Sequence, residues 1–220
     1  KANMTNEKIT SKLIIHKVDK NGNPIAGVKF GIFDLDNNLL DTIITDQNGL
    51  AEITKEYGSY YYQEVETVVG FVLNNDKIYF DIKEHNKVID STIINEKITS
   101  KLIIHKVDKN GNPIAGVKFG VFDLEDNLLD TIITDQNGLA EITKEYGSYY
   151  YQELETVLGF VLNDEKIYFD IKEHNKVIDS TIINEKVEMP KTYNTDIISI
   201  IKYGILFSLG MGLLFYAKKK

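Results

Sequence analysis

The sequence predicts an all-β protein of two tandem sandwich domains followed by a C-terminal transmembrane helix. Residues 11–99 recur as residues 100–188 with nine changes, all conservative except the last, Thr99 to Glu188. Within each copy, short β-branched and aromatic runs alternate with Gly, Asn and Asp turns, a pattern typical of sandwiches or barrels. Near the C-terminus, 21 residues are almost entirely apolar. The repeat sets the number of domains, and the apolar run predicts the helix.

The repeat also suggests a longer array. The stretch NEKITSKLII at residues 6–15 recurs at residues 95–104, so residues 1–10 resemble the tail of a preceding copy. We therefore expect the chain to be the C-terminal part of a longer protein. Tandem copies this similar stack one unit end to end, which extends reach rather than adding chemistry.

Each repeat is expected to contain seven strands. In the first copy they are Lys12–Val18, Val28–Leu35, Leu39–Thr45, Leu50–Thr54, Ser59–Glu66, Lys77–Ile82 and Lys87–Asn95. The turns between them contain Asn-Gly pairs or asparagines, which tolerate the left-handed backbone that tight hairpins need. The joint at residues 96–100 contains neither Gly nor Pro, which predicts a stiff connection.

Composition excludes several classes of protein. The chain has no cysteine, so no disulfide framework supports its small domains. Its net charge of −8 comes without a basic patch, which argues against nucleic-acid binding. His16 and His85 are isolated, so a zinc site is not expected. The segment 19–23 begins like a calcium loop but lacks the required glycine and glutamate, which favours a turn. We expect no metal or cofactor.

The C-terminal segment has the features of a membrane anchor. Residues 197–217 would span ~30 Å as a helix, enough to cross a bilayer core. Lys218 to Lys220 follow, and this basic tail predicts a cytoplasmic C-terminus with the repeats outside the cell. Lys202 can extend to the outer interface. The alternative, a buried soluble helix, is disfavoured because the chain offers no partner helix.

Three polar residues stand at strand positions that otherwise face a core. Lys17, Glu64 and Asn95 alternate in register with apolar neighbours, namely Leu13 and Ile15, Tyr60 and Tyr62, and Ile93. All three types are poor strand-core residues. Each recurs in the second copy, as Lys106, Glu153 and Asn184.

Four stretches together resemble a known family: LIIHKVDKNGNPIAGVKFGIFD, TDQNGLAEI, YYYQEVETVVGFVL and STIINEK. They are similar to the B-type repeat domain of Gram-positive collagen adhesin, the Cna B-type fold, over both repeats. The resemblance implies a transthyretin-like Greek-key sandwich in which a first-strand lysine bonds to an asparagine or aspartate of the last strand. By motif, Lys17 would join Asn95 and Lys106 would join Asn184, with Glu64 and Glu153 as catalysts. Thr67-Val68 departs from the family's Ala-Pro.

The residue types suit such an isopeptide bond. An amine attacks only when it is neutral, and burial in an apolar core lowers the pKa of a lysine. The same burial favours a protonated glutamate, which can polarise the asparagine carbonyl and shuttle protons as ammonia leaves. This is self-modification in a single turnover, so the chain is not expected to be an enzyme. One alternative is a buried Lys–Glu ion pair with Asn95 as a hydrogen-bonding residue. Asp90 and Asp179 are rival acceptors, although they have the opposite strand parity.

Residues 189–196 carry a second resemblance. Met189-Pro190-Lys191-Thr192-Tyr193, followed by the apolar span and the basic tail, is similar to the sortase signal Leu-Pro-x-Thr-Gly of Gram-positive surface proteins. Pro190 and Thr192 match it, whereas Met189 and Tyr193 depart from it. The resemblance implies that sortase cuts after Thr192 and joins the protein to peptidoglycan. A specialised sortase or simple retention in the membrane are the alternatives.

Together these observations predict a surface protein anchored in the bacterial cell wall, whose domains form a rigid stalk. In one alternative, the repeats are themselves an adhesive module for a host protein or glycan, with exposed aromatics such as Tyr61 as contacts. A pilus subunit is another alternative. An enzyme acting on external substrates is disfavoured, because no catalytic cluster exists besides the buried residues.

Overall fold

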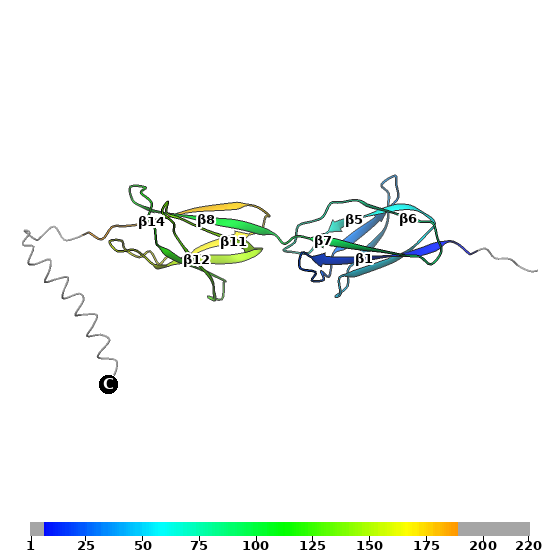
Figure 1. The fold of residues 1–220 in the computed structure, drawn as a ribbon, viewed down its shortest axis with the longest axis horizontal. Helices are drawn as coiled ribbons and strands as arrows, with labels where there is room; N and C mark the ends of the chain where they lie inside the picture. The colour runs from blue at the N-terminus through cyan, green and yellow to red at the C-terminus, as the bar shows by residue number, and fades with distance from the viewer. Residues whose placement is uncertain (1–6, 189–220) are drawn as a thin grey trace, which may run out of the picture. The chain divides into compact units, whose positions relative to one another are not determined.

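A computed structural model of the chain describes residues 7–188 and contains two all-β repeats (Figure 1). The strands of the first repeat are β1 (Thr10–Asp19), β2 (Lys29–Phe33), β3 (Leu39–Ile44), β4 (Leu50–Glu56), β5 (Gly58–Glu66), β6 (Ile78–Ile82) and β7 (Val88–Asn95). Those of the second are β8 (Thr99–Asp108), β9 (Lys118–Phe122), β10 (Leu128–Ile133), β11 (Leu139–Glu145), β12 (Gly147–Glu155), β13 (Ile167–Ile171) and β14 (Val177–Asn184). The expected seven strands per repeat are all present.

Each repeat is a sandwich of a three-stranded and a four-stranded sheet. In the first repeat the strand orders are β4-β1-β7 and β3-β2-β5-β6, and the second repeat has the same arrangement. The first strand, β1, pairs antiparallel with β4 and parallel with the last strand, β7. In the parallel pair Lys17 lies opposite Ile93, and Asp19 lies opposite Asn95. The side chains of Lys17 and Asn95 therefore emerge on the same face, two positions apart.

The core forms where the inner faces of the two sheets meet. Leu13 and Ile15 of β1 pack there with Phe30 of β2, Tyr62 of β5 and Phe80 of β6, all buried. Every second residue of β1 is buried from Ser11 to Asp19, as period-two alternation requires. Lys17 is thus one of the residues that β1 turns toward the core.

The tight turns have the backbone geometry that their residue types predict. The φ angle is positive at Gly22 (82°), Asn37 (67°), Gly49 (71°) and Asn86 (59°). The turn that contains Gly49 reaches β1, because the Lys17 amide donates a 2.7 Å hydrogen bond to the Gly49 carbonyl. A Cβ on Gly49 would lie 2.4 Å from the Lys17 carbonyl oxygen. Only glycine fits here, so this turn helps to fix the backbone of Lys17.

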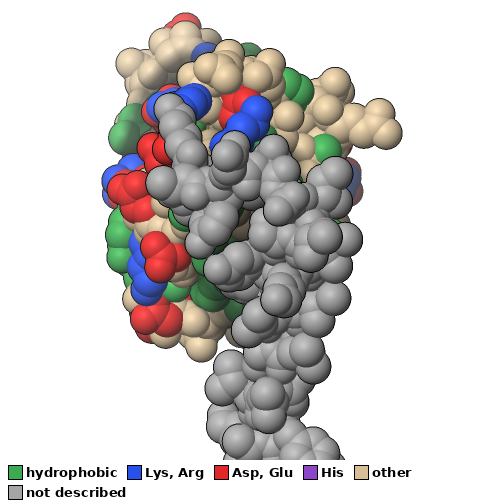
Figure 2. Space-filling model, turned by 90° about the vertical axis from the view of Figure 1, so that its left-hand side faces the viewer, with side chains coloured by type: hydrophobic (Ala, Val, Ile, Leu, Met, Phe, Trp, Pro, Cys, Tyr) green, Lys and Arg blue, Asp and Glu red, His purple; other side chains and the backbone are tan. Residues whose placement is uncertain are grey.

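Acidic and basic side chains lie side by side on the surface. In the view of Figure 2, Lys side chains of the described residues neighbour Asp and Glu side chains rather than forming a patch of one sign. Exposed ion pairs such as Lys12–Glu52 (2.9 Å) and Lys29–Glu66 (2.5 Å) belong to this pattern. Pairs of this kind contribute little to stability.

The anchoring segment falls outside the described part of the chain. Among residues 7–188, no helix has the length and apolar character needed to cross a membrane. The sorting motif at residues 189–193, the expected transmembrane helix at 197–217 and the basic tail at 218–220 all lie beyond the described residues.

Candidate functional site

The three polar residues singled out from the sequence meet inside the first repeat. Lys17 comes from β1, Glu64 from β5 and Asn95 from the end of β7, so the two sheets and both terminal strands contribute. Their exposed fractions are 0%, 3% and 1%. In the second repeat Lys106, Glu153 and Asn184 are buried to the same degree. We call each set of three the buried trio.

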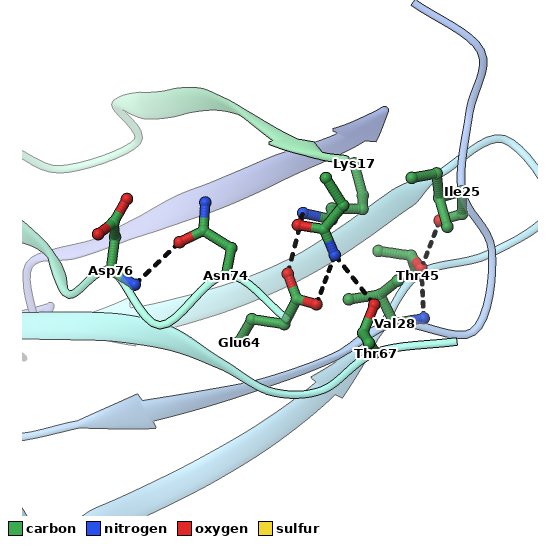
Figure 3. A network of polar contacts seen from close by, with 9 residues as sticks. Lys17, Ile25, Val28, Thr45, Glu64, Thr67, Asn74 and Asp76 are labelled. Atoms are coloured by element: carbon green, nitrogen blue, oxygen red, sulfur yellow. Dashed lines mark hydrogen bonds and ion pairs between the residues drawn. The ribbon is translucent and has the colours of Figure 1, made fainter. Parts of the chain in front are cut away.

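The contacts within the trio form a closed triangle (Figure 3). Lys17 Nζ lies 2.9 Å from Glu64 Oε2 and donates a 2.5 Å hydrogen bond to Asn95 Oδ1. Asn95 Nδ2 donates to Glu64 Oε1 at 2.7 Å. The second repeat repeats this triangle, with Lys106 Nζ 3.0 Å from Glu153 Oε2. There, Asn184 Nδ2 donates to Glu153 Oε1 at 2.7 Å, and Lys106 donates to Asn184 Oδ1.

Burial controls the charge state of the lysine. Removal from water lowers the pKa of Lys17 from its ordinary value of 10.5, while the hydrogen bond and the charge of Glu64 oppose this effect. The pKa of Lys106 is lowered in the same way, against the same opposition from Glu153. A neutral amine is therefore more accessible here than on a surface lysine.

The geometry suits transfer of the asparagine side-chain acyl group from its own nitrogen to the lysine nitrogen, with release of ammonia. The amine contacts the carbonyl oxygen of the asparagine, and the carboxylate touches both the amine and the nitrogen that would leave. One carboxyl group can thus take a proton from the amine and pass a proton to the departing nitrogen. The contacts are equally those of a buried ion pair bridged by an amide.

Sequence reasoning missed one member of the site. Asn95 Nδ2 donates a second hydrogen bond, of 2.9 Å, to Thr67 Oγ1, and Asn184 does the same to Thr156. Thr67 immediately follows β5, where strand parity no longer predicts direction. The departure from the family's Ala-Pro at Thr67-Val68 was the available signal, because it places a hydroxyl three residues after the glutamate.

The rival acceptors Asp90 and Asp179 face away from the core. The Asp90 side chain is 64% exposed, and its Oδ1 lies 2.7 Å from His16 Nε2. Asp179 is equally exposed and lies 3.1 Å from His105 Nε2. The expectation from strand parity is confirmed, and the His16 side chain, 40% exposed, lies on the same outer face as Asp90.

The expectation that Tyr61 is an exposed contact is wrong. Tyr61 is only 3% exposed, because it stacks on Phe33 with a centroid distance of 4.8 Å. Its hydroxyl donates to Asn37 Oδ1 at 3.1 Å. Its ring does face the opposite side of the sheet from Tyr62, but aromatic neighbours cover it there. Tyr79, which also touches Tyr61, is the ring that reaches solvent, at 64% exposure.

The segment that begins like a calcium loop is a turn, as expected. The Asp19 carboxylate accepts hydrogen bonds from the Asn21 amide and from both the amide and the side chain of Asn23. These bonds, that of the Asn23 side chain above all, lower the pKa of Asp19. Across residues 7–188, no cluster of three or more His, Asp or Glu side chains is suited to hold a metal.

Fold and site together define a class of protein. Each repeat is a two-sheet sandwich whose first and last strands run parallel and meet at a buried lysine, glutamate and asparagine. Residues 11–97 and 100–186 both match the family model SpaA, described as a prealbumin-like fold domain, and the chain belongs to this family. The match agrees with the transthyretin-like sandwich expected from the sequence.

Three known proteins show the range of similarity. The Bacillus anthracis TIE protein has a solved structure with 30% identity and a TM-score of 0.75, matching 81% of this chain and 35% of its own. The trypsin-resistant surface T6 protein of Streptococcus pyogenes serotype M6 is 25% identical over 115 residues, 51% of this chain and 21% of that protein. The C-terminal fragment of the pilus adhesin SpaC from Lactobacillus rhamnosus GG shares the fold, with 12% identity, a TM-score of 0.54 and coverage of 84% and 99%. The chain spans about a third of the TIE structure and a fifth of the T6 protein.

Proposed function

We propose that the two repeats form part of a stalk on a bacterial cell surface, and that each repeat is locked by a self-formed Lys–Asn isopeptide bond. The buried trio, present in both repeats, is the observation that carries this proposal. In each repeat it joins the first strand to the last. The similarity to a streptococcal surface protein supports the location at the cell surface.

The reaction balances within the trio. Glu64 takes a proton from the Lys17 ammonium, and the neutral amine attacks the side-chain carbonyl carbon of Asn95. The carboxyl group then protonates the Asn95 nitrogen, the carbon–nitrogen bond breaks, and ammonia leaves. The lysine nitrogen gives up a second proton to Glu64, which leaves a neutral amide. A groove between the loop 72–76 and the end of β7 includes Asn95 in its lining.

The position of the bond suits a load-bearing role. Force applied to a repeat enters at the start of β1 and leaves at the end of β7, which are parallel neighbours. A bond from Lys17 to Asn95 bridges residues that are 78 positions apart in the chain. The sequence between them would then carry no tension.

The bond also addresses the absence of disulfides. Closing a loop of this length contributes roughly 4–5 kcal/mol by the loop-entropy relation for disulfides. A small domain with no cysteine has no other covalent support. Attachment to peptidoglycan by sortase, through Met189 to Tyr193, completes the proposal, with the segment 197–217 as the membrane anchor before cleavage.

The mass of the chain tests the bond. Each Lys–Asn bond expels one ammonia of ~17 Da, so the two-repeat chain should weigh ~34 Da less than its sequence predicts. Glu64→Ala should restore ~17 Da, and Glu64→Ala with Glu153→Ala should restore both losses. The matched control is Glu66→Ala, which removes an exposed carboxylate two residues away and should leave the loss intact.

Two results would contradict the proposal. An unmodified mass for the wild-type chain would leave only the buried ion pair. A loss of ~18 Da per repeat would correspond to water and would point to an aspartate as the acceptor.

A further inference from the structure

The side-chain amide of Asn95 has a partner for its carbonyl oxygen and for both of its N–H groups. Its oxygen accepts from Lys17, and its two N–H groups point to Glu64 Oε1 at 2.7 Å and Thr67 Oγ1 at 2.9 Å. A primary amide has two donors, so Glu64 alone would leave one of them unpaired in the core. Thr67 is therefore the fourth contact of the site (Figure 3).

Close packing of the loop after β5 holds Thr67 in place. A Cβ added to Gly27 would lie 3.2 Å from Val68 Cγ1, so the bare backbone of Gly27 leaves space for this loop. The second repeat has the same arrangement, with Gly116 and Val157 at 3.3 Å. The loop can thus approach closely enough for the threonine hydroxyl to reach the leaving nitrogen.

We propose that Thr67 and Thr156 are positioning residues for isopeptide formation, each fixing the rotation of the asparagine amide. This inference rests on the proposed function. With one N–H held by the hydroxyl, the amide nitrogen stays against Glu64 and the carbonyl stays open to Lys17. Without that hold, the amide can turn about its Cβ–Cγ bond, and the aligned arrangement is less populated. Thr67 takes up no proton and forms no covalent bond in this step.

A rate measurement tests the proposal, and the second repeat serves as an internal control. The full chain is recovered unfolded in urea, checked by mass to be unlinked, and refolded by dilution. Aliquots are denatured at intervals and their intact mass is recorded. The wild-type chain should lose two ammonia molecules at one shared rate. In Thr67→Val, the unchanged second repeat should lose its ammonia at that rate, whereas the first repeat should lose its ammonia about tenfold more slowly. A tenfold change is the effect expected of one hydrogen bond.

Two further variants separate positioning from packing. Thr67→Ser keeps the hydroxyl and should restore the rate of the first repeat, whereas Thr67→Ala should remain slow. Thr156→Val should reproduce the behaviour of Thr67→Val with the roles of the repeats exchanged. If circular dichroism shows that Thr67→Val prevents the first repeat from folding, the rates of ammonia loss in Thr67→Ser and Thr67→Ala are compared instead. A fast Ser variant and a slow Ala variant would support the proposal, and equal rates would contradict it.

The failure of this inference differs from the failure of the proposed function. Equal rates for wild type, Thr67→Val and Thr67→Ala, with ammonia lost from both repeats, would overturn the role of threonine and leave the bond intact. A wild-type chain that never loses ammonia would overturn the bond, and the role of threonine with it.

Discussion

A lysine buried in the core of a small sandwich needs a reason to be there. Lys17 is fully buried beside Glu64, and ion pairs of this kind cost about as much in desolvation as they return. Well-packed apolar residues would serve stability at least as well. Stability therefore does not account for the trio, whereas the proposed reaction between the lysine and Asn95 would. In that proposal the buried Lys–Glu pair is the starting state.

The lowered pKa of Lys17 predicts how the rate depends on pH. The folded-state pKa lies below the ordinary value of 10.5, so the neutral amine becomes populated at a lower pH than in a free lysine. The rate of ammonia loss after refolding should rise with pH and level off before pH 10.5. Intact mass followed over time at several pH values measures this. A rate that falls with rising pH, or that levels off only above 10.5, would contradict the account.

Strand parity predicts the trio because all three residues lie within strands. Alternation alone assigns Lys17, Glu64 and Asn95 to the inner faces, and the structure confirms this. Parity predicts nothing for Thr67, which lies one residue past the end of β5. Parity also predicts which face of the sheet Tyr61 lies on, but it does not predict that Tyr61 is buried there. That burial comes from Phe33 of a neighbouring strand, which stacks on the Tyr61 ring. Contacts across strands decide such cases.

At the scale of elements, turns that pack against β1 hold the site together. The Lys17 amide donates to the Gly49 carbonyl, and the Ile25 amide donates to the Lys17 carbonyl at 2.9 Å. The backbone N–H and C=O of Lys17 are thus both hydrogen-bonded to turns. Gly49 must be glycine for two reasons, its positive φ and the 2.4 Å approach to the Lys17 carbonyl oxygen.

Alanine at this glycine should be unusually costly. Gly49→Ala with Gly138→Ala should lower the free energy of unfolding by more than roughly 2 kcal/mol per repeat. The alanine would be strained in the left-handed conformation, and its Cβ would displace the nearby backbone. Gly22→Ala with Gly111→Ala is the matched control, because these positions share the positive φ but have nothing within 4 Å of the added Cβ. It should cost about 1 kcal/mol per repeat. Urea unfolding measures both, and equal midpoints would refute the argument.

The ends of the elements show what sequence patterns leave out. The pattern predicts a strand over Val28–Leu35, whereas β2 ends at Phe33. The chain turns there because the Asp34 carboxylate accepts hydrogen bonds from the amides of Asp36 and Asn38. An aspartate that bonds to the backbone two and four residues ahead stops a strand, and apolar Leu35 conceals this in the pattern.

At the scale of the molecule, the proposed anchor decides where the protein ends up. If sortase cuts after Thr192, the protein becomes bound to peptidoglycan and loses the apolar segment at 197–217. Boiling cells in detergent should then leave the protein in the wall until a peptidoglycan hydrolase is added. Thr192→Ala should move it to the detergent fraction, because a membrane segment dissolves whereas an amide bond does not. Release of the wild-type protein by detergent alone would show that Tyr193 prevents sorting.

The central claim is that the bond makes each repeat inextensible. Force on a repeat pulls the start of β1 and the end of β7 in opposite directions, and the proposed bond joins these two strands through Lys17 and Asn95. With the bond in place, about eighty residues are shielded from tension. Without it, those residues can be pulled out, up to ~3.5 Å for each one, or roughly 270 Å in all.

Single-molecule stretching of the wild-type chain and of Lys17→Ala with Lys106→Ala tests this claim most directly. The account predicts no unfolding step in the wild type at forces that unfold ordinary sandwiches. It predicts a step of roughly 250 Å for each repeat of the variant. Steps of equal length in both proteins would contradict it, because they would show that no covalent bond bears the load between β1 and β7.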